Sequence, residues 1–349
     1  MSRPSPSAPR GRAAAANPTN RFERIAVELE EPGPDRVATE LLRDGSRSIL
    51  ARNDSPDVGF DVSVNPYRGC EHGCIYCYAR PTHEYLGFSA GLDFESRILV
   101  KEDAPQLLRR ELMSPNWRPQ TVAMSGVTDP YQPVERKLEI TRRCLAVLAE
   151  LRNPVGLITK NELVTRDLDL LGELASHDAV AVFLSITSLD PEVARRMEPR
   201  ASHPRDRLKA IASLAAAGIP VGVNVAPVVP AITDHEVPRI LEAAAEAGAR
   251  YAGFTVLRLP GAVAGLFEGW LDEHFPDRKE KVLSRVREMR GGKLNEARFG
   301  HRMRGDGLFA EQIRTVFQTF KKKYGYAAGY PKLSTAAFRR PGEQLALFG

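Results

Sequence analysis

The chain has 349 residues, of which 43% are hydrophobic and 27% are charged, and its formal net charge is +5. This hydrophobic content supports a sizeable core in one large domain, with or without small appendages. No apolar run is long enough to cross a bilayer, and the first 20 residues contain arginines but no apolar stretch like that of a secretory signal. We therefore expect a cytoplasmic protein without a membrane partner. The basic charge is compatible with nucleic-acid binding and equally with solvated lysine and arginine side chains.

Residues 1–20 are rich in proline, serine, alanine and arginine, a composition that predicts a disordered tail. Residues 47–69 then alternate apolar and polar positions around a turn signal at residues 54–59. This pattern predicts two short strands, which form an N-terminal β extension and lead into a cysteine-rich loop.

The loop at residues 65–79 reads NPYRGCEHGCIYCYA and holds three of the four cysteines, Cys70, Cys74 and Cys77. Thiolates are soft ligands, and close spacing lets one loop surround one metal centre. Two kinds of centre fit the C-x3-C-x2-C pattern. A structural zinc ion would need a fourth ligand, for which His72 or His83 is available. A 4Fe–4S cluster would place one thiolate on each of three irons and leave the fourth iron open for a substrate or cofactor.

Strands and helices alternate after this loop. We expect strands at residues 121–126, 155–160, 179–187, 219–230 and 250–260, and helices at residues 105–112, 137–151, 166–176, 204–218 and 234–248. The strands are almost continuously apolar, as is typical of buried parallel strands joined by right-handed βαβ units. The number of units fits a full or partial barrel better than a small open sheet. The predicted fold class is therefore α/β, with further amphipathic helices over residues 262–325.

In a βα barrel the functional site lies at the carboxyl ends of the strands. The polar and glycine residues that the sequence places there are Ser125, Gly126, Thr159, Lys160, Ser185, Thr187, Asn224 and Arg258. The fourth cysteine, Cys144, falls instead on the apolar face of the helix expected at residues 137–151. We therefore expect it to be buried in the core rather than reactive.

The cysteine loop, together with THEYLGF at residues 82–88, resembles the signature of the radical S-adenosylmethionine (radical SAM) superfamily. Residues 48–260 resemble the branch that contains spore photoproduct lyase, a DNA repair enzyme, and within it an uncharacterised bacterial subgroup labelled photolyase-like. The resemblance implies a partial TIM-type (β/α)6 barrel, and a loop that leads into such a barrel makes the zinc alternative the less favoured one. It also implies a 4Fe–4S cluster on the three loop cysteines, with SAM on the open iron. One electron, from a donor such as flavodoxin or ferredoxin, would then cleave SAM to a 5′-deoxyadenosyl radical.

The same resemblance implies a set of cofactor-binding residues. Tyr76, just before the third cysteine, would contact the adenine. The segment after the strand at residues 121–126 would bind the methionine amino group, and Lys160 and Ser185 would face the methionine carboxylate. The full expected set is Tyr76, Ser125, Gly126, Asp129, Lys160, Ser185, Arg200 (cofactor support) and Asn224 (ribose contact). For each of them the alternative is a polar residue that caps a helix or a strand end.

One departure from the lyase limits the functional prediction. The lyase carries a cysteine at the second strand end, which returns a hydrogen atom to the substrate radical, whereas residues 125–131 read SGVTDPY here. Cys144 lies too far along the following helix to replace it. Tyr131 is a candidate hydrogen donor or substrate contact, with a packing role as the alternative.

The resemblance therefore predicts a radical SAM enzyme that acts on nucleic acid in a lyase-like DNA repair reaction. Two alternatives stay open. One is the same class of enzyme acting on a protein, a tRNA or a small molecule, and the other is a non-enzymatic, metal-bound module that binds DNA or the sliding clamp. The expected organisation is a tail at 1–20, a core with its N-terminal extension at 21–260, a helical extension at 261–330 and a second tail at 331–349.

The second tail ends in GEQLALFG. Gln344, Leu345, Leu347 and Phe348 resemble the peptide by which bacterial repair proteins dock on the sliding clamp. The alternative is that these apolar side chains fold back onto an edge of the barrel.

Overall fold

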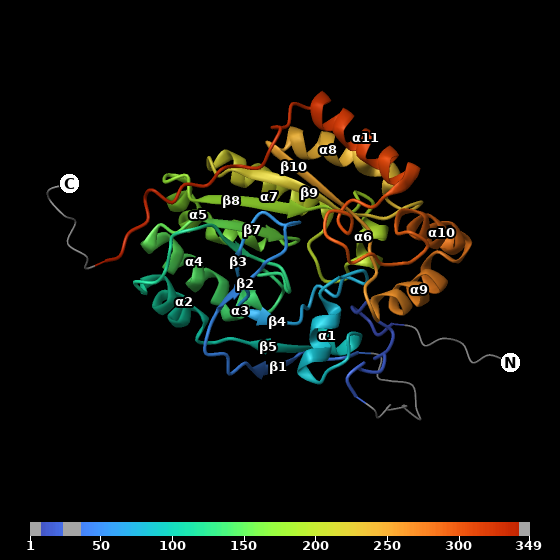
Figure 1. Cartoon of the computed structure of the whole chain (residues 1–349), viewed down its shortest axis with the longest axis horizontal. Coiled ribbons are helices and arrows are strands. Elements are labelled where there is room, and N and C mark those ends of the chain that lie inside the picture. Colours follow the sequence, from blue (N-terminus) through green and yellow to red (C-terminus); the bar gives the residue numbers. More distant parts are fainter. Residues whose placement is uncertain (1–7, 24–35, 342–349) are drawn as a thin grey trace.

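The computed structural model describes residues 8–23 and 36–341 of the chain. Its core is a seven-stranded sheet in the order β10-β9-β8-β7-β6-β3-β2 (Figure 1). From β3 to β10 the neighbouring strands are parallel, and β2 pairs with β3 in the antiparallel direction. The strands are β2 (Leu50–Arg52), β3 (Val62–Val64), β6 (Val122–Met124), β7 (Val155–Thr159), β8 (Val180–Ser185), β9 (Val221–Val228) and β10 (Tyr251–Val256).

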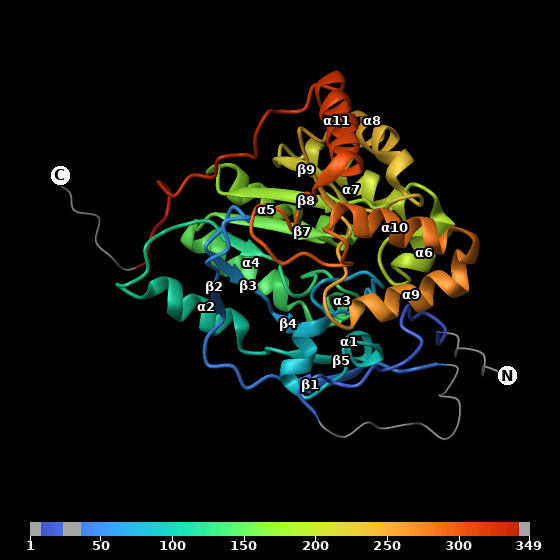
Figure 2. The same cartoon turned by 45° about the vertical axis from the view of Figure 1, so that its right-hand side comes forward.

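A smaller sheet in the order β1-β5-β4 lies beside this core (Figure 2). Its strands are β1 (Glu40–Arg43), β4 (Tyr67–Arg68) and β5 (Arg97–Val100). The α-helices are α1 (Leu92–Ser96), α2 (Ala104–Met113), α3 (Glu135–Leu138), α4 (Ile140–Leu151), α5 (Leu168–Ala175), α6 (Pro191–Met197), α7 (Pro204–Ala216), α8 (Val237–Glu246), α9 (Val263–His274), α10 (Lys279–Met289) and α11 (Gly307–Lys323). The 3-10 helices are η1 (Arg80–Leu86), η2 (Glu162–Asp167), η3 (Asp234–Glu236) and η4 (Pro276–Arg278).

The expected α/β class and partial barrel are confirmed, because parallel strands alternate with helices that pack on one face of a curved sheet. The sheet does not close on itself, since β10 and β2 are its two ends. Among the described residues, no helix is both long and apolar enough to cross a membrane.

The helix expected over residues 137–151 is divided into α3 and α4. Glu139, between them, has a left-handed φ of 52°. The buried carboxylate of Glu135 accepts hydrogen bonds from the Thr141 and Arg142 amides, at 3.0 and 3.3 Å, and from the Tyr67 hydroxyl. This side chain thus satisfies amides at the start of α4 that would otherwise lack partners, and it supports the break.

The N-terminal residues that the structure describes differ from the disordered tail expected there. Residues 12–14 are buried. The Arg12 guanidinium donates to the Glu95 carbonyl and, at 2.8 Å, to the Val37 carbonyl. The Ala13 and Ala14 amides donate to the Glu95 carboxylate at 3.1 and 3.0 Å. The composition of this segment predicted disorder, because the partners that hold it in place lie about 80 positions away in the sequence and leave no local pattern.

Residues 326–341 form a strap that crosses the amino-terminal ends of the strands (Figure 1, red coil). The amides of Ala327, Ser334 and Arg339 donate to the carbonyls of Arg250 and Asp178, shortly before β10 and β8, and of Leu151 at the end of α4, with N···O distances of 2.9 to 3.0 Å. The expected tail at 331–349 is therefore attached to the barrel as far as residue 341. The clamp-like residues Gln344, Leu345, Leu347 and Phe348 lie outside the described residues.

Aromatic side chains pack against glycines on the inner face of the sheet. Phe183 on β8 lies opposite Gly222 on β9, and a Cβ atom at Gly222 would come within 2.4 Å of the Phe183 ring. The Phe183 ring centre lies 5.5 Å from that of Tyr330, which the strap brings into the barrel. A Cβ atom at Gly253 would meet the Tyr330 hydroxyl at 2.6 Å. Glycine at position 222 is therefore required by the buried Phe183 ring, whereas the contact at Gly253 is with the hydroxyl tip of a side chain that is 66% exposed.

We predict that Gly222→Ala lowers the free energy of unfolding by about 1–3 kcal/mol, because the added methyl group overpacks the Phe183 ring. Gly156→Ala on β7 is the matched control, since the nearest atom to its new Cβ would be 4.0 Å away. Urea denaturation of the two variants measures the difference. Equal stability of the two variants would contradict the packing argument.

Candidate active site at the carboxyl ends of the strands

The three clustered cysteines lie on the loop between β4 and η1. Cys70 and Cys74 are buried and Cys77 is half-buried. The loop is a series of tight turns, in which the Gly73 amide donates to the Cys70 carbonyl and the Cys77 amide to the Cys74 carbonyl, both at 3.2 Å. Gly73 has a left-handed φ of 66°, and a Cβ atom there would lie 2.7 Å from a Glu95 carboxylate oxygen. The loop can therefore wind tightly only with glycine at this position.

The electrostatic surroundings of these thiols suit a metal–sulfur centre. Burial raises the pKa of all three cysteines, and neighbouring thiols add to the rise at Cys70 and Cys74. Each would remain a neutral thiol unless a cationic centre stabilised the thiolate. In the described part of the chain, no three His, Cys, Asp or Glu side chains are placed to hold a single metal ion. A 4Fe–4S cluster spreads its thiolates over three irons, so three closely spaced thiols on one loop fit such a cluster.

The two histidines proposed as zinc ligands are engaged elsewhere. His83 Nε2 lies 3.0 Å from the Arg97 carbonyl, and its ring packs against the rings of Phe88 and Phe94. His72 lies between Asp129 and Asn161, with Nδ1 3.3 Å from the carboxylate and Nε2 3.2 Å from the amide nitrogen. These contacts argue against the zinc alternative.

A fully buried ion pair supports the cysteine loop from behind. Arg80 on η1 donates at 2.5 Å to Glu95 on α1. The rest of its guanidinium donates to the carbonyls of Gly73 and Cys74 at 3.0 and 2.9 Å, and to those of residues 90 and 91. The opposite side of the Glu95 carboxylate binds the amides of residues 13 and 14. One ion pair thus connects the cysteine loop, η1, α1 and the N-terminal segment, and the sequence analysis missed it.

We predict that Arg80→Met lowers the free energy of unfolding by about 3–5 kcal/mol, because it leaves the Glu95 carboxylate buried without its cation. The variant should also retain less iron after anaerobic reconstitution, since the Gly73 and Cys74 carbonyls lose their donor. Arg195→Met is the matched control, because Arg195 and Glu192 form an exposed pair on α6 that is worth about 0–1 kcal/mol. Denaturant midpoints and iron content that match between the two variants would refute this role of Arg80.

Most of the expected cofactor residues on the strands converge next to the loop. Ser185 ends β8, and its register partner Asn224 lies in the middle of β9, because that strand continues to Val228 instead of ending at Asn224 as expected. The Lys160 ammonium, after β7, donates to the Ala226 carbonyl at 3.1 Å and lies 5.8 Å from the centre of the Tyr76 ring. Lys160 thus connects Tyr76 of the cysteine loop with β9, the strand on which Asn224 pairs with Ser185 of β8.

Glu198 completes this group, although the sequence analysis did not select it. Its buried carboxylate accepts hydrogen bonds from Tyr76, from Arg207 and, at 2.7 Å, from Thr187, and it lies 3.6 Å from the Lys160 ammonium. Burial alone would raise the pKa of Glu198, but Arg207, Lys160 and the two hydroxyl donors outweigh it and lower the pKa to about 2. Burial, Cys74 and Glu198 raise the pKa of Tyr76 well above its usual range. Glu198 is therefore an anion and Tyr76 a neutral donor at neutral pH.

Other expected residues have structural partners. The Asp129 carboxylate accepts hydrogen bonds from the Thr159 hydroxyl at 2.7 Å and the Lys160 amide at 2.8 Å, as the capping alternative describes. Arg200 pairs at 3.0 Å with Glu71 inside the cysteine loop.

Three further predictions meet the described structure as follows. Ser125 and Gly126 lie in the loop after β6, which ends earlier than expected. Tyr131 is fully buried and its hydroxyl donates to Asp167 at 2.9 Å, which is the packing alternative. The expected burial of Cys144 is confirmed.

The rim above the cysteine loop is aromatic and cationic. Tyr78 directly follows Cys77, is half exposed, and donates at 2.6 Å to the Gly126 carbonyl. The Arg258 guanidinium, after β10, lies 4.9 Å from the centre of the Tyr78 ring. Sequence reasoning noted Arg258 as a strand-end residue but not its aromatic neighbour.

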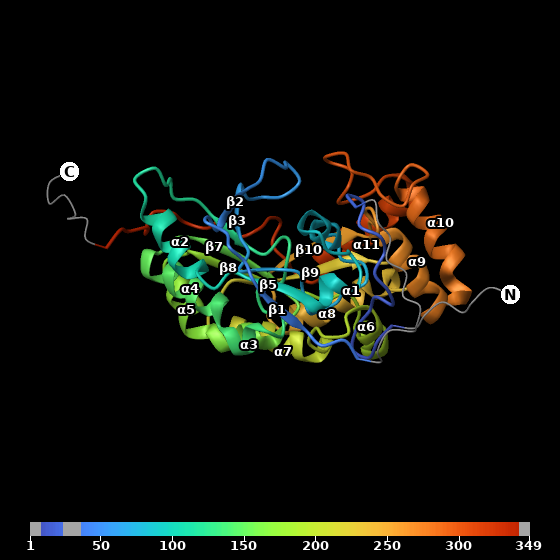
Figure 3. The same cartoon turned by 90° about the horizontal axis from the view of Figure 1, so that it is seen from below.

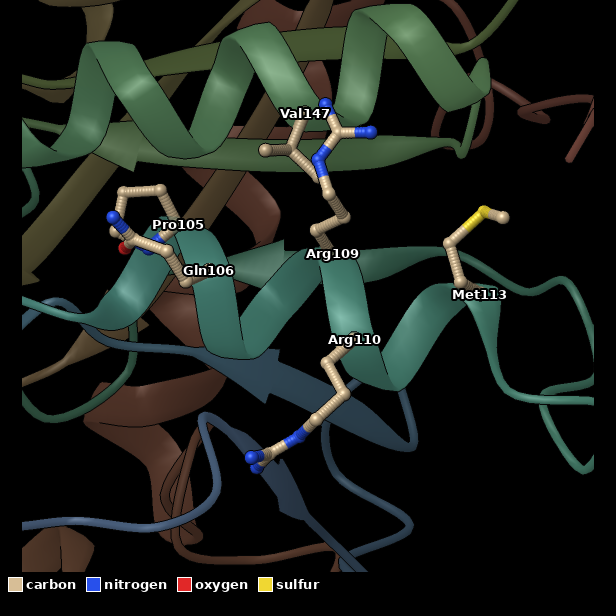
Figure 4. A pocket seen from close by; sticks show the side chains of 6 residues that line it. All are labelled: Pro105, Gln106, Arg109, Arg110, Met113 and Val147. Carbon is tan, nitrogen blue, oxygen red and sulfur yellow. The ribbon is translucent and has the colours of Figure 1, made fainter. Parts of the chain in front are cut away.

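A separate hollow lies on the outer surface between α2 and α4 (Figure 4). Its lining residues are Pro105, Gln106, Arg109, Arg110, Met113 and Val147. Arg109 is occupied by an ion pair with Glu150. None of these lining residues belongs to the group around the thiols, so this hollow is not the candidate site.

Residues 64–244, which include the cysteine loop and strands β6 to β9, match the sequence profile of the Radical SAM superfamily. The chain belongs to the radical SAM superfamily. An uncharacterised protein of Mycobacterium tuberculosis is 41% identical over 234 residues, which are 66% of this chain and 67% of that protein. A radical SAM Nα-GlyT isomerase of Pseudomonas phage M6 is 22% identical over 287 residues, 81% of this chain and 58% of that protein.

The fold of this radical SAM protein is shared with a solved member of the superfamily. Spore photoproduct lyase complexed with a dinucleoside spore photoproduct superposes with a TM-score of 0.58 at 17% sequence identity, over 82% of this chain and 80% of that one. At this identity the likeness shows the fold. It supports the partial barrel that the strand pattern predicted.

Proposed function

We propose that this enzyme holds a 4Fe–4S cluster on Cys70, Cys74 and Cys77 and acts on nucleic acid, in a lyase-like reaction of DNA repair. The observation that carries the proposal is the cluster of three thiols, two buried and one half-buried, on the loop whose Tyr76 ring lies 5.8 Å from the Lys160 ammonium, with Ser185 and Asn224 paired on β8 and β9. When bound, the cluster and SAM supply a 5′-deoxyadenosyl radical that abstracts a hydrogen atom from a substrate.

The residues of the chain bind and orient the cofactor in this proposal. The Lys160 ammonium and the Ser185 hydroxyl are placed to bind the methionine carboxylate. Glu198 holds Lys160 at the site by charge and holds Tyr76 by a hydrogen bond, so the Tyr76 ring has a fixed face for the adenine. The Asp129 carboxylate fixes the end of β7, from which Lys160 extends.

Two observations support a nucleic-acid substrate. The fold is shared with a lyase that binds a dinucleoside photoproduct. The rim pairs exposed aromatic rings with arginines, at Tyr78 with Arg258 and at Phe299 with Arg302, whose guanidinium lies 4.6 Å from the ring centre. Aromatic and cationic side chains together suit stacked bases and phosphates. The absent cysteine in residues 125–131 keeps a protein, tRNA or small-molecule substrate as the second candidate.

We predict that Cys74→Ala abolishes both cluster binding and SAM cleavage, because only two of the three thiolates that hold the cluster would remain. The measurements are iron and sulfide content, the visible absorption of the anaerobically reconstituted protein, and 5′-deoxyadenosine formed with dithionite. Cys144→Ala is the control for loss of a buried thiol and should retain both properties. Full cluster content and cleavage in Cys74→Ala would refute the metal assignment.

We predict that deuterated DNA carrying ultraviolet photoproducts transfers deuterium to 5′-deoxyadenosine, as detected by mass spectrometry. Undamaged DNA, RNA and a deuterated extract of proteins and small molecules are incubated in parallel with SAM and a flavodoxin or ferredoxin donor. Deuterium from damaged DNA supports the repair proposal. Transfer from the extract alone would replace it with the second candidate.

A further inference from the structure

The two ends of the open sheet are joined by a contact between two loops. One loop, residues 53–61, connects β2 and β3, and the other, residues 290–306, connects α10 and α11 (Figure 3). The Asp57 carboxylate accepts hydrogen bonds from the Gly300 amide at 2.6 Å and from Arg302 Nε at 2.5 Å. Arg302 Nη2 also donates to the Ser55 hydroxyl. We call these contacts of Ser55 and Asp57 with Gly300 and Arg302 the latch.

The arginine side of the latch is anchored to the barrel. Arg290 is buried and donates to the carbonyls of residues 256 and 257 at the end of β10, and to those of His301 and Arg302. The Val256 amide donates at 3.1 Å to the Met303 carbonyl. Arg302 is therefore presented by a loop that is attached to the last strand.

The loop that carries Ser55 and Asp57 is held mainly by hydrogen bonds within the loop. The Asn53 amide donates at 2.8 Å to the Asp61 carbonyl, and the Asn53 side chain donates at 2.9 Å to the Phe60 carbonyl. The loop at 53–61 is thus a folded unit at the edge of the sheet. Release of Ser55 and Asp57 from Arg302 would free this unit without disturbing the strands.

The latch is connected to the rim of the candidate active site through the end of β10, because Arg290 binds the carbonyls of Leu257 and Arg302 and the next residue, Arg258, lies 4.9 Å from the centre of the Tyr78 ring. The half-exposed Phe299 ring packs under Arg302. The ring of Tyr78, the residue directly after Cys77, packs under Arg258. Arg302 and Arg258 are thus two arginines, each beside an aromatic ring, on segments held together by Arg290.

We propose that Asp57 occupies the phosphate-binding position of Arg302, and that a phosphodiester of single-stranded nucleic acid displaces it to open the barrel. A phosphate has the charge and the acceptor oxygens to take over both Nε and Nη2, which now bind Asp57 and Ser55 separately. The Gly300 amide would remain as a further donor, and Phe299 would provide a stacking surface worth about 1–3 kcal/mol per base. This inference rests on the nucleic-acid substrate proposed above and adds a gate to it.

The test measures binding of a fluorescent single-stranded oligodeoxynucleotide by anisotropy, with reconstituted enzyme and without reductant or SAM. Asp57→Asn should bind at least three-fold more tightly than the wild type, because the competing carboxylate is removed. Asp169→Asn is the control for one lost negative charge, since Asp169 lies on α5 and pairs with Arg142 away from the latch. Tightening in Asp57→Asn beyond that in Asp169→Asn supports competition, and equal affinity overturns it.

Arg302→Gln should weaken binding and reduce the slope of log affinity against log salt by about 0.7, the contribution of one phosphate on a single strand. Limited trypsin digestion reports on the latch itself, because Asp57→Asn should speed cleavage after Arg298, Arg302 and Arg304 without added DNA. An unchanged salt slope in Arg302→Gln would overturn the phosphate assignment. Cleavage of Asp57→Asn at the wild-type rate would overturn the latch.

These outcomes are separate from those of the deuterium experiment, because binding is measured without chemistry. Failed deuterium transfer with a positive binding series would remove the repair reaction and leave the gate. Successful transfer with no effect of Asp57→Asn would do the reverse.

Discussion

The buried ion pair between Arg80 and Glu95 is the contact on which the candidate active site depends. A charge pair without solvent is stable only when its remaining donors and acceptors are also satisfied. Here they are satisfied by two carbonyls of the cysteine loop on one side and two N-terminal amides on the other. The desolvation cost of the pair is thus offset by bonds that also fix the shape of the loop, and the positions of the thiols follow from that shape.

A second buried charge organises the other half of the site. Glu198 sits among Arg207, Lys160 and the Tyr76 hydroxyl, so one carboxylate orients a strand-end cation and the aromatic residue of the cysteine loop. Its neighbours, not its burial, determine that it stays ionised. The two halves meet at Cys74, whose carbonyl binds Arg80 and whose next-but-one neighbour binds Glu198.

The sequence predicted what depends on local pattern. Cysteine spacing located the loop, and the alternation of apolar strands with helices located Lys160, Ser185 and Asn224 at one edge. Contacts between distant residues left no such pattern, since Tyr76 and Glu198 are 122 positions apart and Arg12 and Glu95 are 83 apart. Asp129 shows a different limit, because a carboxylate at a strand end looks the same in sequence whether it binds a ligand or secures the strand. The sequence did not predict the latch, for both reasons: its members are ordinary loop residues, and they lie far apart in the chain.

The strap has a consequence for the order in which the chain can acquire its final form. Tyr330 lies beside Gly253 and Asn224, so a contact at an expected cofactor residue is supplied by a segment that is synthesised after the cysteine loop and all strands of the barrel. The cysteine loop and residues 12–14 that support it are synthesised before the strap, and contacts of such long sequence separation form slowly. In a growing chain, the three thiols would therefore be present before the strap covers the amino-terminal ends of the strands. A preassembled cluster would have its freest access to the thiols at that stage.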